Sequence, residues 1–262
     1  MFTPTLDNYE NGPAGFKFGP GTGLGPDYTD HFFLTSAPKG EQWAFQVKPA
    51  GDSFAMVNDH KIGEGVPLVG LNFGPDGGLY GVDWGGGYPL NESGAVWRID
   101  VPADKAHPNR ATTKALIGAD FAEKAIDELV DLLGNPDQRV RLKAQYELAK
   151  REALDALAGV AGTIEADQLA RIHAIWGMGQ LLRAGGAETS GFVDLFTDPD
   201  PEIRAQAIKT VTDPQGRRLG LDRISGPFGE NALTDDLVAR LEDPSQRVRI
   251  QALLGLGRIG DP

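Results

Sequence analysis

The spacing of apolar residues changes at about residue 102, and the change predicts two kinds of structure. Before this point, short runs rich in aromatic and β-branched residues are separated by Gly- and Pro-containing turns, a pattern typical of antiparallel strands. We expect strands at residues 31–35, 43–48, 53–57, 69–73, 79–84 and 95–101. After this point, apolar residues recur every three or four positions, which predicts helices. The expected organisation is a β domain at 1–102, a linker at 103–120 and a helical domain at 121–262.

The helical half repeats one sequence unit. In three copies a proline stands five residues before an arginine, and a weaker copy keeps only the arginine. These positions are Pro136, Arg141, Arg171, Pro199, Arg204, Pro244 and Arg249. The Asn or Asp before each proline can accept hydrogen bonds from the free N–H groups of a helix start, and proline is tolerated in the first helical turn. Because a single helix pair cannot bury its apolar stripe, the repeat predicts a solenoid of about four stacked helix pairs.

The repeated arginines have two interpretations. They could form an anion-binding ladder along one face, or each could bond acidic or carbonyl groups of the neighbouring repeat. The chain has 37 acidic against 25 basic side chains and a formal net charge of -12, which favours the second interpretation. The same balance argues against nucleic acid as a partner, because affinity for a phosphate backbone comes mainly from Lys and Arg.

Composition also excludes several chemistries. The chain has no cysteine, so it cannot by itself hold a disulfide, a zinc–cysteine finger, a cysteine-ligated iron–sulfur cluster or a covalent c-type haem. No apolar run approaches the roughly 18 to 20 residues of a membrane span, so no transmembrane segment is expected. Residues 1–15 also lack the basic start, apolar stretch and cleavage site of a secretory signal peptide.

Two places combine residue types that could bind a ligand. Asp83 and Trp84 end a predicted strand, where the carboxylate could bind a cation, a quinone cofactor or a sugar hydroxyl. The alternative is that Asp83 caps the following Gly-rich loop and Trp84 is a packing residue. His173 shares a helix face with Trp176, and it could be an axial ligand or a buried histidine that is hydrogen-bonded within the solenoid. The structural alternative is favoured in both places. No catalytic residue is identified, and a metal site is left open.

A family resemblance becomes visible when the two halves are taken together. The stretches that carry it are NYENGPAGFKFGPGTGL (8–24), DHFFLT (30–35), FGPDGGLYGVDW (73–84) and AVWRI (95–99). They resemble the last blades of the β-propeller in membrane-associated dehydrogenase-like haem-binding proteins of Planctomycetes and Verrucomicrobia, relatives of the glucose/sorbosone dehydrogenases. The helical units resemble HEAT repeats. The resemblance implies a two-domain β + α fold, in which a partial β-propeller of about two blades precedes an α-α HEAT-like solenoid.

The resemblance also implies a function for a larger protein. In that family a full propeller precedes these blades and a cytochrome c domain follows the repeats, so we expect this chain to be a fragment of an exported, periplasmic redox protein. Its parent would oxidise a sugar or an alcohol, with pyrroloquinoline quinone or calcium in the propeller and haem c in the further domain. No cofactor is expected within this chain, and the chain alone is not expected to be catalytic.

The length of the β half agrees with a partial propeller, since a closed ring needs about 4 to 8 blades of about 40 to 45 residues. The alternative function is a non-enzymatic HEAT-repeat interaction module with a small β domain. Its partner would be another protein or the rest of the parent chain.

Overall fold

The chain forms two compact units. The computed structural model describes residues 12–51, 53–85, 93–213 and 230–259. The first unit takes the described part of Met1–Ala119 together with Pro136–Gln138, and the second takes Asp120–Asn135 and the described part of Arg139–Pro262. The short segment Pro136–Gln138 belongs to the first unit because it contacts a loop there: the Gln138 amide donates to the Pro20 carbonyl at 2.7 Å.

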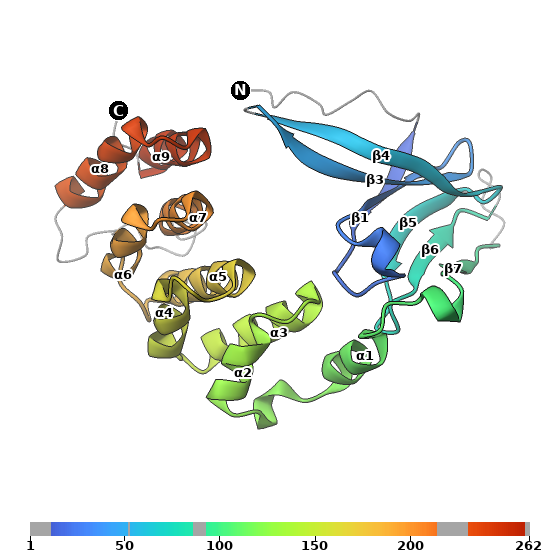
Figure 1. Cartoon of the computed structure of the whole chain (residues 1–262), viewed down its shortest axis with the longest axis horizontal. Coiled ribbons are helices and arrows are strands. Elements are labelled where there is room, and N and C mark those ends of the chain that lie inside the picture. Colours follow the sequence, from blue (N-terminus) through green and yellow to red (C-terminus); the bar gives the residue numbers. More distant parts are fainter. Residues whose placement is uncertain (1–11, 52, 86–92, 214–229, 260–262) are drawn as a thin grey trace. The chain divides into compact units, whose positions relative to one another are not determined.

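Two antiparallel sheets form the first unit (Figure 1). The first contains β1 (Pro13–Phe18), β2 (Phe32–Ser36), β3 (Glu41–Ala50) and β4 (Ser53–Glu64), and the second contains β5 (Leu68–Phe73), β6 (Leu79–Asp83) and β7 (Val96–Ile99). Both sheets are meanders in which each strand pairs with the next along the chain. Within the described residues these strands form open sheets and no closed ring. β1 lies outside the predicted runs because its two phenylalanines alternate with Gly and Lys.

The two sheets share one hydrophobic core. Alternation along β2 directs Phe33 into this core, where its ring meets that of Phe73 edge to face at 5.4 Å. Leu24, Ala44 and Leu79 complete the buried cluster. Contacts of β5 with β1 and β2 place this core between the sheets.

The predicted linker is attached to the first unit. It contains a short 3-10 helix, η2 (Ala103–Lys105), and α1 (Arg110–Gly118). The His107 amide donates to the Leu24 carbonyl at 2.9 Å, and the Arg110 guanidinium pairs with Asp100 at 2.7 Å. These contacts hold the start of the segment against the sheets.

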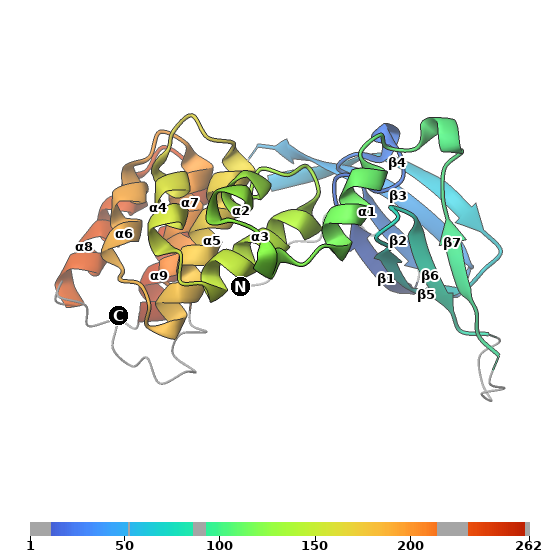
Figure 2. The same cartoon turned by 90° about the horizontal axis from the view of Figure 1, so that it is seen from below.

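The second unit consists of helix pairs in two layers (Figures 1 and 2). One layer contains α2 (Ile126–Leu132), α4 (Leu154–Gly162), α6 (Ser190–Val193) and α8 (Glu230–Ala239). The other contains α3 (Gln138–Lys150), α5 (Gln168–Ala184), α7 (Pro201–Val211) and α9 (Gln246–Ile259). The 3-10 turns η4 (Asp194–Thr197) and η6 (Arg240–Glu242) extend α6 and α8. None of the described helices is both long and apolar enough to span a bilayer.

The predicted apolar stripe faces the interior of this stack. Its buried members include Val140, Ala144, Leu148, Ala174, Met178, Ile203, Ala207, Val211, Val248 and Ala252. These residues recur at every fourth position on successive helices, so each helix buries the same face. The helical region is therefore a stack of HEAT-like helix pairs.

Candidate interaction surface

A short turn precedes the second helix of the later pairs, and an aspartate builds it. Asp198 Oδ1 accepts a hydrogen bond from the Asp200 amide at 2.9 Å. Asp243 Oδ1 accepts one from the Ser245 amide at 2.8 Å. The prolines between them, Pro199 and Pro244, stand two residues before their helices and not in the first turn. The expectation that these prolines lie in the first helical turn is wrong, because the aspartate forms a turn before the helix begins.

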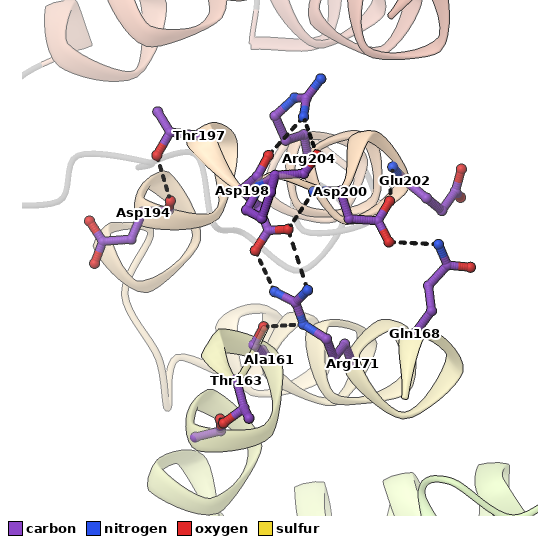
Figure 3. A network of polar contacts seen from close by, with 12 residues as sticks. Ala161, Thr163, Gln168, Arg171, Asp194, Thr197, Asp198, Asp200, Glu202 and Arg204 are labelled. Carbon is purple, nitrogen blue, oxygen red and sulfur yellow. Dashed lines mark hydrogen bonds and ion pairs between the residues drawn. The ribbon is translucent and has the colours of Figure 1, made fainter. Parts of the chain in front are cut away.

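These aspartates also join successive helix pairs. Arg171 on α5 binds the carboxylate of Asp198 through both terminal nitrogens, and its Nε donates to the Ala161 carbonyl at 2.9 Å (Figure 3). Arg204 on α7 also binds the Asp243 carboxylate through two nitrogens, but these are Nε and one terminal nitrogen, at 2.9 and 2.8 Å. Both arginines are buried. A planar guanidinium matches a carboxylate bidentately, so each pair fixes the position of the next repeat on the last.

The two outer arginines of the series have different partners. Arg141 donates to the Asn135 carbonyl at 2.6 Å. Arg249 donates to the carbonyls of Asp243 and Pro244 at 2.8 and 3.1 Å. Arg204 makes the equivalent contacts with the carbonyls of its own turn, Asp198 and Pro199. All four arginines therefore donate to backbone carbonyls. Arg171 and Arg204 also bind a carboxylate of the following helix pair.

A second line of polar contacts crosses the layer of α3, α5, α7 and α9. His173 Nδ1 lies 2.8 Å from Gln145 Oε1 on α3. Its ring packs edge to face on Trp176, whose indole N–H donates to Gln206 Oε1 on α7 at 3.0 Å. Gln206 Nε2 in turn donates to Glu202 at 2.7 Å. Glu202 is paired with Arg247 on α9, so the line spans all four helices.

The histidine in this line is neutral over most of the pH range. Its side chain is 2% exposed. Burial, helped by the positive charge of Arg141, lowers the pKa of His173 from 6.5 to about 4. Its contacts with Gln145 and Trp176 orient the ring inside the stack. This environment matches the structural interpretation and does not fit an exposed axial ligand.

One face of the same four helices is partly accessible, although His173 and Gln206 within it are buried. Each helix contributes three residues to this face: those at positions −2, +2 and +5 relative to its repeated arginine. Successive members are four and then three positions apart, so they lie on the same side of the helix. We call this set the row face. Its members are Arg139, Lys143, Tyr146, Leu169, His173, Trp176, Glu202, Gln206, Lys209, Arg247, Gln251 and Leu254.

Apolar and basic side chains dominate the row face. Tyr146 is 54% exposed and Leu169 is 45% exposed. The basic members outnumber the single acidic one, Glu202, in a chain whose net charge is -12. The sequence pattern indicated His173 and Trp176 but not Tyr146. The signal that identifies Tyr146 is the repeat register, because it stands five residues after Arg141 as Trp176 stands five after Arg171.

The other predicted ligand site holds internal contacts. Asp83 accepts hydrogen bonds from the Trp97 indole and, at 2.9 Å, from the Ala95 amide. These bonds lower the pKa of the Asp83 carboxyl. Trp84 follows β6 and is 43% exposed. Asp83 thus connects β6 with β7. Asp83 and His173 belong to different compact units, so the two predicted sites are separate features.

No group of three or more His, Cys, Asp or Glu side chains that could hold a metal ion occurs among the described residues. Both oxygens of Asp83 accept hydrogen bonds from the segment that forms β7, and His173 Nδ1 lies against Gln145 of α3.

Comparison with solved structures finds distant likenesses, among them an engineered protein and a lyase complex. Neither a protein-family model nor a curated protein matches the chain. An engineered protein solved by the Northeast Structural Genomics Consortium aligns at 20% identity over 57% of this chain and 70% of its own, with a TM-score of 0.31. The complex of CpcE and CpcF of phycocyanin lyase from Nostoc sp. PCC7120 aligns at 16% identity over 55% of this chain and 68% of that chain, with a TM-score of 0.27.

Proposed function

We propose that this chain is a protein-interaction scaffold whose row face binds an acidic segment of a partner protein. The observation that carries the proposal is Trp176, a partly buried aromatic residue of this face. Gln206 and His173 hold its indole in one orientation. Trp, Tyr and Arg are the residue types that dominate binding energy at protein interfaces, and a side chain that is already ordered loses less entropy on binding.

The charges of the row face support an acidic partner. Arg139, Lys143, Lys209 and Arg247 contribute positive charge, and Glu202 is already paired with Arg247. Lys143 lies over the Phe121 ring, with its ammonium nitrogen 4.4 Å from the ring centroid. A basic face in an acidic chain attracts an acidic segment while the rest of the surface repels it.

Site-specific crosslinking tests the proposal. A photoreactive phenylalanine derivative is placed at position 146 of the full chain, and a matched control is placed at Ile164, which is equally exposed but lies between α4 and α5. We expect position 146, and not position 164, to crosslink a protein segment rich in Asp and Glu. Lys209→Glu should reduce that crosslink at least tenfold, whereas Lys114→Glu in α1 should leave it unchanged.

Equal crosslinking from both positions, or a crosslink that survives Lys209→Glu, contradicts the proposal. The crosslink should also weaken with rising salt, because exposed charge pairs are screened.

A second proposal concerns the whole polypeptide. The two meander sheets, with their strands in sequence order, are the arrangement found in propeller blades. Together with the family resemblance, they support membership in an exported dehydrogenase-like protein that oxidises a sugar or alcohol, with quinone, calcium and haem c held by other parts. The test is the neighbouring open reading frame. Further blades upstream and a Cys-x-x-Cys-His motif downstream are expected, and a frame without either ends this proposal.

A further inference from the structure

Two histidines of the first unit come together at the rim of its hydrophobic core. His31 lies one residue before β2 and is 5% exposed, whereas His60 on β4 is exposed. Their ring centroids are 5.8 Å apart, and the rings meet nearly at a right angle. The Tyr28 ring lies 5.7 Å from the first and 5.9 Å from the second, and it also packs against the core. The cluster is therefore closed on the side of the core and open to solvent at His60.

A β-bulge brings His60 to this place. Between Val57 and His60 the register of β4 against β3 shifts by one residue, so His60 stands opposite Ala44. Without this extra residue Asp59 would take that position, and His60 would point to the other face of the sheet. Asn58, within the bulge, has a left-handed backbone with a φ of 55°. The bulge thus decides that an imidazole faces the core side of the sheet.

His31 lies on the same face of the sheet as His60. Ala44 pairs with Phe33 on its other side, and residues directly opposite each other point to one face. His31 stands two residues before Phe33, so alternation gives it this face as well. The fold therefore brings together two histidines that the sequence places on separate strands.

Both imidazoles are held in the same tautomer. Nδ1 of His31 lies 2.9 Å from the Thr29 carbonyl oxygen, and Nδ1 of His60 lies 2.9 Å from the Asn58 carbonyl oxygen. Because a carbonyl oxygen only accepts, each Nδ1 carries the hydrogen, and each Nε2 of the neutral ring carries a lone pair. Neither Nε2 has a hydrogen-bond partner in the part of the chain that the structure describes.

A third side chain fixes the two carbonyl groups that orient these rings. Gln46 Nε2 donates to the Thr29 carbonyl at 3.0 Å, and Gln46 Oε1 accepts from Asn58 Nδ2 at 2.6 Å. Gln46 therefore connects the two residues whose carbonyls hold the histidines. Metal-binding histidines are oriented in this way, since the ring nitrogen that is turned away from the ion donates to a carbonyl or carboxylate that is itself held in place.

From these observations we infer that His31 and His60 bind one divalent transition-metal ion through their Nε2 atoms. Imidazole suits Cu²⁺, Ni²⁺ and Zn²⁺, and of these ions copper binds most tightly. A metal–imidazole bond is about 2.0 to 2.1 Å long, so the ion lies about 3 Å from the centroid of each ring that binds it. Two centroids 5.8 Å apart are within the span of two such distances.

Water supplies the remaining ligands of the ion. No group of three His, Asp or Glu side chains suited to a metal occurs among the described residues, so the protein contributes the two imidazoles. The site belongs to the first unit, whereas the row face belongs to the second. The inference therefore goes beyond the proposed function and does not depend on it.

Titration with Cu²⁺ alone tests the site. Calorimetry of the full chain gives the affinity, and pulsed electron paramagnetic resonance counts the bound imidazoles through the remote nitrogen of each ring. We expect one ion for each chain, with two imidazoles bound to it. His60→Gln should weaken the affinity at least tenfold and leave one imidazole. His60 is the decisive position, because it is exposed and its substitution leaves the core intact.

Two further variants separate ligands from other residues. His107→Gln is the matched control, because His107 Nδ1 accepts a hydrogen bond from the Asn109 amide at 3.1 Å and so has the opposite tautomer. It should leave the affinity within about twofold and both imidazoles bound. Gln46→Ala keeps both ligands but removes the side chain that holds their carbonyls, so we expect two imidazoles and an affinity about tenfold weaker.

Competition identifies the class of ion. Zn²⁺ should displace Cu²⁺ from the site when it is added in excess, whereas Mg²⁺ should not, because Mg²⁺ prefers oxygen ligands. One bound imidazole or none in the unaltered chain overturns the inference. Unchanged affinity in His60→Gln, or equal losses in His60→Gln and His107→Gln, also overturns it. None of these results bears on crosslinking at position 146, so each proposal can fail without the other.

Discussion

Arg204 and Arg249 are the same side chain in two environments. Both donate to the carbonyls of their own turn, and only Arg204 also binds a carboxylate from the next pair. Burial raises the pKa of that partner, Asp243, but the hydrogen bonds from Arg204 and the Ser245 amide outweigh it and hold the pKa below its ordinary value. The charged pair is therefore the stable state of this contact near neutral pH.

Substitution of these two arginines should separate the contribution of the bonds to turn carbonyls from that of the ion pair between repeats. Arg204→Gln leaves the Asp243 carboxylate buried without its cation, and we expect it to lower the free energy of unfolding by about 3 kcal/mol. Arg249→Gln removes only bonds to carbonyls at a half-exposed site, and we expect a loss of about 1 kcal/mol or less. Urea denaturation followed by circular dichroism measures both. Equal losses would mean that the inter-repeat ion pair adds nothing to stability.

His173 should make the stability of the helical unit depend on pH. The folded protein holds this side chain neutral down to about pH 4, whereas the unfolded chain takes up a proton at about pH 6.5. Stability is therefore fully present above pH 6.5 and falls as the pH drops from 6.5 to 4, by up to about 3 kcal/mol. His173→Gln should flatten this part of the profile of unfolding free energy against pH. An unchanged slope in the variant would contradict the assigned pKa.

Among the elements, α5 and α9 differ in what lies against them. α5 has helices on both sides within its layer, and the close approach of α7 requires Gly179. α9 contacts α7 on one side, and its Gly257 faces open space. Glycine is thus required by close packing on α5, whereas on α9 no described neighbour requires it.

Alanine at these two positions should have opposite effects. Gly179→Ala would place a methyl group on Thr210 and force α5 and α7 apart, so we expect a loss of about 1 to 3 kcal/mol. Gly257→Ala meets no neighbour and removes backbone freedom of the unfolded chain, so we expect a gain of a few tenths up to about 1 kcal/mol. Thermal unfolding of the two variants checks the signs. Destabilisation by Gly257→Ala would indicate that something covers α9 in the free protein.

At the scale of the whole molecule, the chain has two compact units with separate cores. The β core is built around Phe33 and Phe73, and the helical core around the stripe at every fourth position of α3, α5, α7 and α9. Because the buried residues named for the two cores belong to different compact units, damage to one core should leave the protection of the other largely intact.

Hydrogen exchange can test this independence. Phe33→Ala removes a fully buried ring, and we expect it to lower the stability of the first unit by about 3 to 5 kcal/mol. Amides of β2, β3 and β5 should exchange more than a hundredfold faster, while those of α5 and α7 keep their rates. A uniform increase over both units would mean that they unfold together.

The β and helical halves could be predicted from the sequence, because the spacing of apolar residues in a strand or a helix depends only on neighbouring positions in the chain. Helix positions such as Val140, Ala144 and Leu148 share a face whatever packs on them, and a turn such as the one after β5 needs only Asp and Gly. The repeat register also came from the sequence, including the four arginines. β1 was missed because glycine and lysine interrupt its apolar pattern.

The partners of these residues depend on segments far apart in the chain. Asp198 and Arg171 are 27 residues apart, and Thr22 and Asp137 are 115 apart. Packing of one pair on the next decides which arginine gains a carboxylate, which aromatic ring stays exposed and which glycine is approached. Local spacing therefore specified the repeated unit and its register. The surface left accessible by stacking, the row face, follows from three-dimensional packing, because exposure is a property of neighbours and not of a residue type.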